Sequence, residues 1–306
     1  MNVLIIGEVF FGYANRIKEH LEKRGVQTDL VFSYAYSSKD RTKKKLLGQE
    51  PNEYGYYNKL LNADKNYDVI MVINGKNLPT YFVQQLNSYY PTAKKVLYVW
   101  DDLGNLKQSK VFFDVFDSKY TYSKSDAENH SEFIFQPFFF THESNIQKRD
   151  IGASFVGSLH SDRFETLKRF EKFNSKVKFF FYLYSDFISY LKFIRSVRFG
   201  DVKFKALSYD DYIAVLGKSQ ALIELPHPAQ HNITTRAIEV LGTRTKLITT
   251  SDAVKKYDFY NDNNIFIVKN HNISEIQNWL EQDYQEYPAE LISKYHIDSW
   301  LTVLLS

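Results

Sequence analysis

The stretch QHNITTRAIEVLGTRTKLITTS, residues 230–251, decides the fold, since one short passage carries a helix start, a helix end and a buried strand. Thr234 and Thr235 stand where the capping residues of a helix belong, and Gly242 stands where that helix should stop. The apolar run after Gly242 is typical of a strand buried on both faces of a sheet. The stretch therefore predicts a helix that leads into a parallel strand, the repeating unit of α/β domains.

The same pattern extends in both directions along the chain. Continuous apolar runs of strand length alternate with amphipathic helical segments, as in βαβ units. In the first half these runs cover residues 2–6, 28–32, 67–73, 95–100, 118–123 and 132–138. In the second half they cover residues 153–158, 176–183, 201–206, 220–225 and 264–268. The sequence thus predicts two doubly wound, Rossmann-like α/β domains that face a cleft at the carboxyl ends of their strands.

A polar stretch, THESNIQKRD at residues 141–150, separates the two sets of strands and is typical of a linker. We therefore expect an N-terminal domain over residues 1–145 and a C-terminal domain over residues 146–287. The closing segment, residues 288–306, has a helical pattern and is apolar enough to pack back onto the first domain.

The composition excludes several classes of protein. The chain has 306 residues, of which 44% are hydrophobic and 25% charged, as expected for a packed globular protein. It contains no cysteine, which excludes disulfides and thiolate metal sites. The net charge is only +3 and no nucleic-acid-binding motif accompanies it, so we expect no nucleic acid partner.

The amino terminus, MNVLIIGEVF, has an apolar run too short to cross a bilayer, and no cleavage-type signal follows it. We therefore expect a cytoplasmic protein. The basic run Lys39–Lys45 has two interpretations: peripheral contact with the anionic inner face of a membrane, or a solvated loop.

The helix predicted to begin near Thr234 is a candidate anion site. The unpaired amides of a first helical turn and the positive end of the helix dipole attract anions. Arg236 adds a planar guanidinium that suits phosphate oxygens, and Glu239 could accept hydrogen bonds from a ribose diol. The alternative is an ordinary, well-capped helix without a ligand, since each of these features is common in such helices.

Two glycine-containing turns follow predicted strands. Gly157 and Ser158 end a strand and precede a helix, where a glycine lets the backbone approach a ligand, although such turns are common. The other turn, GEVFFGY at residues 7–13, has glycines at positions 7 and 12 only. It lacks the complete dinucleotide fingerprint, which argues against a nicotinamide or flavin dehydrogenase.

Two carboxylates, Asp101 and Asp102, emerge at the carboxyl end of a predicted strand in LYVWDDLGN, residues 97–105. Either could take a proton from an acceptor hydroxyl in a desolvated site. The alternative is that one caps the next helix and the other is solvated. Glu8 is a further candidate base. The sequence shows no metal-ligand spacing, P-loop or nucleophile elbow.

These segments, in this order, resemble a family. GEVFFGYANRIKEHLEKRG (7–25), YVWDD (98–102), SFVGSLHSDR (154–163) and the passage from Gln230 to Val268 look like bacterial glycosyltransferases of lipopolysaccharide-core and capsule biosynthesis, related to the CgeB-like group. The resemblance covers nearly the whole chain and is strongest from Gln230 to Val268. It implies the glycosyltransferase-B fold.

The resemblance also implies roles for individual residues. The second domain would bind a nucleotide-sugar donor and the first a glycan or lipid-linked acceptor. Asp101 matches the family's aspartate better than Asp102, while Asn232 stands where the family usually has glycine. The implied donor-binding residues are Gly157, Ser158, Arg163, His231, Thr234, Thr235, Arg236 and Glu239.

One spacing bears on the mechanism. Retaining enzymes of this fold commonly carry two glutamates eight positions apart, and counting back from Glu239 gives His231. We therefore expect an inverting reaction, in which a carboxylate activates the acceptor hydroxyl. We expect no metal or cofactor, since helix amides and Arg236 would stabilise the departing nucleoside diphosphate. Two alternatives stay open: a sugar-nucleotide epimerase on the same scaffold and a non-catalytic sugar-nucleotide-binding protein.

Overall fold

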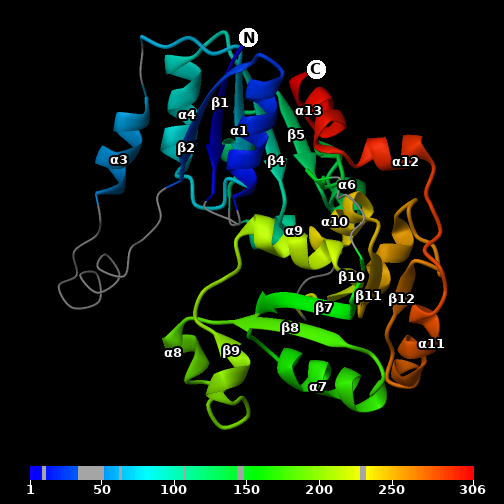
Figure 1. The fold of residues 1–306 in the computed structure, drawn as a ribbon. Helices are drawn as coiled ribbons and strands as arrows, with labels where there is room; N and C mark the ends of the chain where they lie inside the picture. The colour runs from blue at the N-terminus through cyan, green and yellow to red at the C-terminus, as the bar shows by residue number, and fades with distance from the viewer. Residues whose placement is uncertain (9–11, 34–51, 62–63, 107, 143–147, 228–231) are drawn as a thin grey trace. The chain divides into compact units, whose positions relative to one another are not determined.

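The computed structural model describes residues 1–8, 12–33, 52–61, 64–106, 108–142, 148–227 and 232–306 (Figure 1). The chain forms two compact units. Unit 1 comprises Met1–Phe138 together with Ile297–Ser306, and unit 2 comprises Phe139–His296. Each unit has its own parallel sheet and its own hydrophobic core.

The sheet of unit 1 has six strands in the order β2-β1-β3-β4-β5-β6, and every described pair is parallel. The chain leaves β1 towards β2 on one side and β3 towards β4 on the other, so the order reverses between β1 and β3. The strands are β1 (Asn2–Gly7), β2 (Gln27–Phe32), β3 (Val69–Ile73), β4 (Lys94–Val99), β5 (Ser118–Thr121) and β6 (Ile134–Phe135).

The helices of unit 1 surround this sheet and include the last helix of the chain (Figure 1). They are α1 (Tyr13–Lys23), α3 (Glu53–Leu60), α4 (Thr80–Tyr89), α5 (Lys110–Phe113), α6 (Lys124–Asn129) and α13 (Ile297–Leu305), with a 3₁₀ turn at Leu103–Asn105. The Trp300 ring of α13 packs edge-on against Tyr98 of β4, with 4.8 Å between the ring centroids. Arg24 also forms an ion pair of 2.9 Å with Asp298.

The sheet of unit 2 has the order β12-β11-β10-β7-β8-β9, again with parallel pairs throughout the described strands. The chain leaves β7 towards β8 and leaves β10 towards β11 in the opposite direction. The strands are β7 (Ile151–Ser158), β8 (Phe179–Tyr184), β9 (Val202–Lys203), β10 (Ser219–Glu224), β11 (Lys246–Thr249) and β12 (Ile265–Ile267). The predicted α/β class, with two doubly wound sheets, is confirmed.

The helices of unit 2 are mostly short. They are α7 (Arg163–Phe173), α8 (Phe187–Tyr190), α9 (Tyr209–Gly217), α10 (Arg236–Thr243), α11 (Ile276–Leu280) and α12 (Ala289–Lys294), with 3₁₀ turns at Phe199–Asp201, Asp252–Lys256 and Ile273–Glu275. Ser208 caps α9 by accepting a hydrogen bond from the Asp211 amide (3.1 Å). No helix among the described residues is long and apolar enough to cross a bilayer.

The units divide at positions that differ from the expected 145/146 and 287/288. The chain enters unit 2 at Phe139 because the buried Phe140 pairs with the end of that unit, where its amide donates to the Tyr295 carbonyl (3.0 Å). Helix α12 stays in unit 2, since the side chains of Lys294, its last residue, and of Tyr295, which follows it, both bind Asp258. Only α13 of the expected closing segment belongs to unit 1.

The expected end of helix α10 at Gly242 is wrong. The helix continues through Thr243, and Arg244 takes the left-handed conformation (φ 48°) that ends it. A Cβ atom at Gly242 would lie 2.3 Å from the His142 carbonyl oxygen and 2.4 Å from the Phe140 ring. Gly242 is thus a packing glycine, required because another segment of unit 2 crosses the helix there.

Candidate functional site

The reversal of strand order between β7 and β10 defines the candidate site of unit 2. In open α/β sheets, ligands bind outside the carboxyl ends of the two strands that flank such a reversal. The segments after β7 and β10 meet there, since the rings of His160 and His227 lie 5.0 Å apart. Of the predicted donor residues, Ser158 is the last residue of β7, and Arg163 and Arg236 are the first residues of the helices that follow β7 and β10.

Arg163 joins the ends of the two strands. Its side chain is buried, and Nε and Nη2 donate to the Leu225 carbonyl at 3.1 and 2.5 Å. Its Nη1 donates to the Ser158 carbonyl at 2.9 Å. Burial, with the nearby charge of Arg236, lowers the pKa of Arg163 to about 10. Because most of its N–H groups are used within the protein, Arg163 shapes the site more than it offers donors to a ligand.

Gly157 serves the packing of β7. A Cβ atom at this position would lie 2.7 Å from the Phe155 ring, which therefore requires the glycine. A second residue in the turn, Ser158, accepts from Arg163 at its side-chain oxygen as well (3.3 Å).

Positive charge gathers at this point. Burial, together with the charges of Arg163, His227 and Arg236, lowers the pKa of His160 to about 4. Arg236 is half-buried at the first position of α10, and no carboxylate of the described residues lies within ion-pair distance of it. A half-buried arginine without an acidic partner, next to a second arginine, favours the binding of an anion.

The start of α10 differs from the prediction in one respect. The Thr234 amide donates to Oε1 of Glu224 at 2.7 Å, and the Arg236 amide donates to the Thr234 hydroxyl at 3.3 Å. The Ala237 amide donates to the Thr234 carbonyl at 3.1 Å. These amides are not the free donors that the sequence suggests, so the half-exposed side chains of Thr235 and Arg236 and the helix dipole remain for a ligand.

Glu224 is a residue of this site that sequence reasoning missed. It is 1% exposed at the carboxyl end of β10, and its Oε2 accepts from the Thr249 hydroxyl at 2.6 Å. With Thr234 on its other oxygen, this carboxylate fixes the loop before α10 to strand β11. The one available signal was an acidic residue at the end of an otherwise apolar strand, QALIEL.

Two predicted donor residues are not found on the exposed surface of the described structure: Glu239 is buried, and His231 is not among the described residues. Glu239 is 1% exposed and faces Tyr212 of α9, whose pKa is raised by burial and by the Glu239 carboxylate. The Glu239 carboxylate is therefore not accessible to solvent in this structure, which argues against a direct contact with a ribose. His231 lies outside the described residues, as does the basic run Lys39–Lys45.

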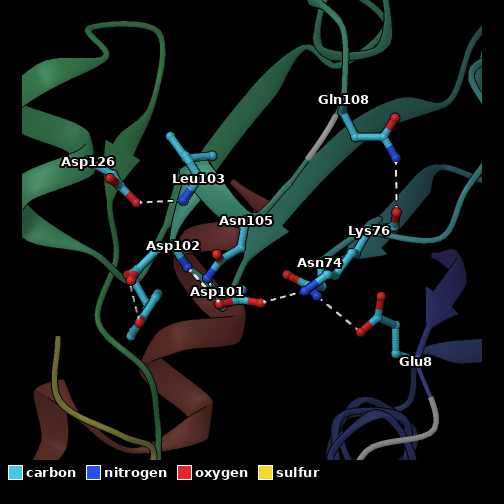
Figure 2. A network of polar contacts seen from close by, with 10 residues as sticks. Glu8, Asn74, Lys76, Asp101, Asp102, Leu103, Asn105, Gln108 and Asp126 are labelled. Atoms are coloured by element: carbon cyan, nitrogen blue, oxygen red, sulfur yellow. Dashed lines mark hydrogen bonds and ion pairs between the residues drawn. The ribbon is translucent and has the colours of Figure 1, made fainter. Parts of the chain in front are cut away.

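A second cluster lies at the carboxyl ends of the central strands of unit 1 (Figure 2). Glu8 follows β1, Asn74 and Lys76 follow β3, and Asp101 and Asp102 follow β4. Figure 2 shows the side chains of Glu8, Asn74, Lys76 and Asp101 close together, whereas the Asp102 side chain turns away from Glu8. The cluster brings the predicted Asp101 near Glu8.

Asp101 is held by several donors. Its Oδ2 pairs with Lys76 Nζ at 3.2 Å, and its Oδ1 accepts from the Asp102 amide and from Asn105 Nδ2, both at 3.0 Å (Figure 2). Asp102 accepts from the Tyr122 hydroxyl at 3.2 Å. The following 3₁₀ turn is fixed by Asp126, which accepts from the Leu103 amide at 2.9 Å. The pair of aspartates thus organises the loop after β4.

Glu8 has the properties of a proton acceptor. Burial raises its pKa, an effect that Asn74 and Lys76 oppose and that the Asp101 charge supports. Asn74 Nδ2 donates to Oε2 at 3.0 Å, whereas the buried Oε1 has no hydrogen-bond partner among the described residues. Carboxylates with raised pKa values and a free oxygen are typical general bases.

The backbone that presents Asn74 is strained. Asn74 is 2% exposed and has a left-handed conformation (φ 65°), and Gly75 follows with φ 69°. Gln108 holds this turn by donating to the Gly75 carbonyl at 2.9 Å. Strained, fixed backbone of this kind is concentrated at functional sites. Among the described residues, no group of three histidine, aspartate or glutamate side chains is placed to hold a metal ion.

Comparison with solved structures identifies the fold of the chain. No protein-family model and no curated protein matches the chain. AviGT4, a glycosyltransferase involved in avilamycin A biosynthesis, is similar over 100% of this chain and 98% of its own, with a TM-score of 0.59 and 9% identity. The chain has the glycosyltransferase-B fold. A UDP-GlcNAc 2-epimerase from Neisseria meningitidis, bound to UDP-GlcNAc, is similar over 100% of this chain and 99% of its own, with a TM-score of 0.54 and 11% identity.

Proposed function

We propose that the protein is a glycosyltransferase that moves a sugar from a nucleotide-sugar donor to a glycan or lipid-linked acceptor in bacterial surface polysaccharide synthesis. The observation that carries the proposal is the positive cluster at the strand reversal of unit 2, where Arg236 has no acidic partner among the described residues. A donor diphosphate supplies the missing negative charge.

The reaction is a direct displacement with inversion. The acceptor hydroxyl oxygen forms a bond to the anomeric carbon while the bond from that carbon to the diphosphate oxygen breaks. The hydroxyl proton passes to a carboxylate, and the nucleoside diphosphate leaves with its negative charge stabilised by Arg236 and the dipole of α10. The mechanism needs no metal, since these groups carry the stabilisation.

The structure favours Glu8 over Asp101 as the proton acceptor. Glu8 combines a raised pKa with a buried oxygen that lacks a described partner, whereas both oxygens of Asp101 already accept hydrogen bonds. Asp101 then acts through Lys76 and Asn105, by ordering the surroundings of Glu8. The donor assignment concerns unit 2 and the base assignment concerns unit 1, so each is testable by itself.

Calorimetry with nucleoside diphosphates tests the donor assignment. Arg236→Ala should weaken binding by about 10–100-fold, because a charge-assisted hydrogen bond contributes about 1.5–3 kcal/mol. Arg244→Asn is the matched control, since it removes a cation from the other end of α10 and asparagine tolerates the left-handed backbone. Equal affinity in the two variants would remove the assignment of the diphosphate to Arg236.

A second candidate is a sugar-nucleotide epimerase, favoured by the likeness to the Neisseria meningitidis enzyme. Incubation with a panel of sugar nucleotides separates the two functions. An epimerase converts the donor sugar without an acceptor, whereas a transferase requires an acceptor or hydrolyses the donor slowly. A binding protein without catalytic activity leaves every donor unchanged.

A further inference from the structure

Unit 2 exposes large apolar side chains over one short segment, residues 187–204. Ile188 is 76% exposed, Phe199 62% and Phe187 59%. The segment comprises α8, the turns after it, a 3₁₀ turn and the edge strand β9, and Figure 1 shows α8 and β9 at the same end of the unit. The exposed apolar residues of the segment are Phe187, Ile188, Leu191, Ile194, Phe199 and Phe204.

The aromatic members form one continuous cluster. The Phe204 ring lies 5.1 Å from Phe199 and 6.0 Å from Phe187, measured between ring centroids. The buried Tyr190 lies beneath them, 5.7 Å from Phe204, and its hydroxyl donates to the Val197 carbonyl at 3.0 Å. Because Tyr190 and Val197 are buried, the exposed rings pack on residues that are fixed within the unit.

Basic residues share this surface. Residues 187–205 contain five lysines and arginines and one acidic residue, Asp201, whereas the net charge of the whole chain is only +3. All five basic side chains are exposed, and none of them forms an ion pair with a described residue. The five are Lys192, Arg195, Arg198, Lys203 and Lys205.

We propose that residues 187–205 form a docking surface for an anionic lipid bilayer. Phenylalanine, isoleucine and leucine enter the boundary between headgroups and acyl chains, while lysine and arginine bind the anionic headgroups. The excess of basic over acidic residues argues against a second copy of the chain, because a symmetric contact would bring like charges together. The surface is separate from the run Lys39–Lys45 and does not depend on the proposed transfer reaction.

Co-sedimentation of the full chain with vesicles tests the proposal. We expect binding to phosphatidylcholine vesicles that contain 30% phosphatidylglycerol, and at least tenfold weaker binding to phosphatidylcholine alone. Binding should weaken between 50 and 500 mM salt, because salt screens the headgroup charges. Equal binding to both kinds of vesicle, or binding to neither, overturns the proposal.

Variants separate the two contributions. Arg195→Glu with Arg198→Glu should weaken binding roughly 30-fold, since each basic residue near an anionic surface contributes about a fivefold factor. Phe187→Ser with Ile188→Ser should weaken it at least tenfold. The controls are Lys172→Glu with Lys176→Glu and the single change Phe173→Ser, which alter exposed residues of unit 2 outside the surface.

For the variants, the outcome that contradicts the proposal is an equal loss of vesicle binding in the control variants and in the surface variants. A second copy of the chain is the other occupant that an apolar surface admits. Light scattering detects such a dimer. The bilayer assignment would be overturned if the original chain formed concentration-dependent dimers and did not bind vesicles, and if Phe187→Ser with Ile188→Ser made those dimers dissociate. A circular dichroism melt of each variant confirms that the fold is retained.

Discussion

Asn74 directs its side-chain amide at Glu8, with 3.0 Å between Nδ2 and Oε2. Asn74 adopts a left-handed backbone to do so, and the strained turn leaves the second carboxylate oxygen of Glu8 buried without a described partner. Raised pKa, fixed orientation and an open acceptor position are what general base catalysis requires.

Glu8→Gln should therefore lower kcat by about 10²–10⁴-fold, the usual contribution of a general base, while nucleoside diphosphate affinity stays unchanged. Asp101→Asn should cause a smaller loss, because it weakens the contact to Lys76 without removing the proton acceptor. Steady-state kinetics and calorimetry provide the two measurements. Full activity in Glu8→Gln together with an inactive Asp101→Asn would return the role of base to Asp101.

His160 should make unit 2 sensitive to acid. Its pKa is about 4 in the folded protein and about 6.5 in an unfolded chain, so only the unfolded state takes up a proton between these values. The stability that the neutral imidazole contributes is complete above pH 6.5 and is lost as the pH falls towards 4. The Tm of the original protein should therefore drop more between pH 7 and pH 5 than the Tm of His160→Asn.

His271→Asn is the control for this experiment, since it replaces an exposed histidine of the same unit. Parallel pH profiles for all three proteins would contradict the prediction. Added inorganic phosphate should reduce the acid sensitivity of the original protein, because an anion near His160 favours its protonated form.

Glu224→Gln should destabilise unit 2. The carboxylate accepts from the Thr234 amide and the Thr249 hydroxyl, and hydrogen bonds to charged groups contribute about 1.5–3 kcal/mol. We expect a loss of about 1–3 kcal/mol in the free energy of unfolding, measured by urea denaturation, together with weaker nucleoside diphosphate binding. Glu281→Gln, an exposed change in the same unit, serves as the control. An unchanged unfolding free energy in Glu224→Gln would show that the loop has another anchor.

Gly242→Ala should also destabilise unit 2, because the new methyl group meets the His142 carbonyl at 2.3 Å and the Phe140 ring at 2.4 Å. Overpacking of this kind costs about 1–3 kcal/mol. Gly200→Ala is a suitable control, since a Cβ atom there has nothing within 4 Å. Thermal unfolding of both variants checks the prediction, and a stabilised Gly242→Ala would contradict it.

The sequence predicts the architecture well because the strands are continuous apolar runs, a local signal. Strands β1, β4, β7 and β10 lie within two residues of the runs that predict them. The role of Gly242 could not be predicted, since it depends on residues 140–142, far away in the chain. In the sequence alone, a glycine after a helical pattern is as typical of a helix end as of close packing against another segment.

The site residues show the same limit. Arg236 and the aspartates after β4 were predictable, because helix starts and strand ends are marked in the sequence. The use of the Thr234 amide by Glu224 and the pairing of Glu8 with Asn74 join segments that only the sheet brings together. Capping patterns show where amides are exposed within a helix, but not which distant carboxylate accepts from them.

Because helix α13 belongs to unit 1, the residues of the two units are completed at different times during synthesis. Unit 1 needs residues 297–306, which the ribosome makes after the whole of unit 2. Unit 2 can therefore complete its sheet while unit 1 still lacks the tryptophan that packs against Tyr98. The later part of the chain is the first to be complete, and a nascent protein stalled before Ile297 would carry a finished second unit beside an unfinished first one.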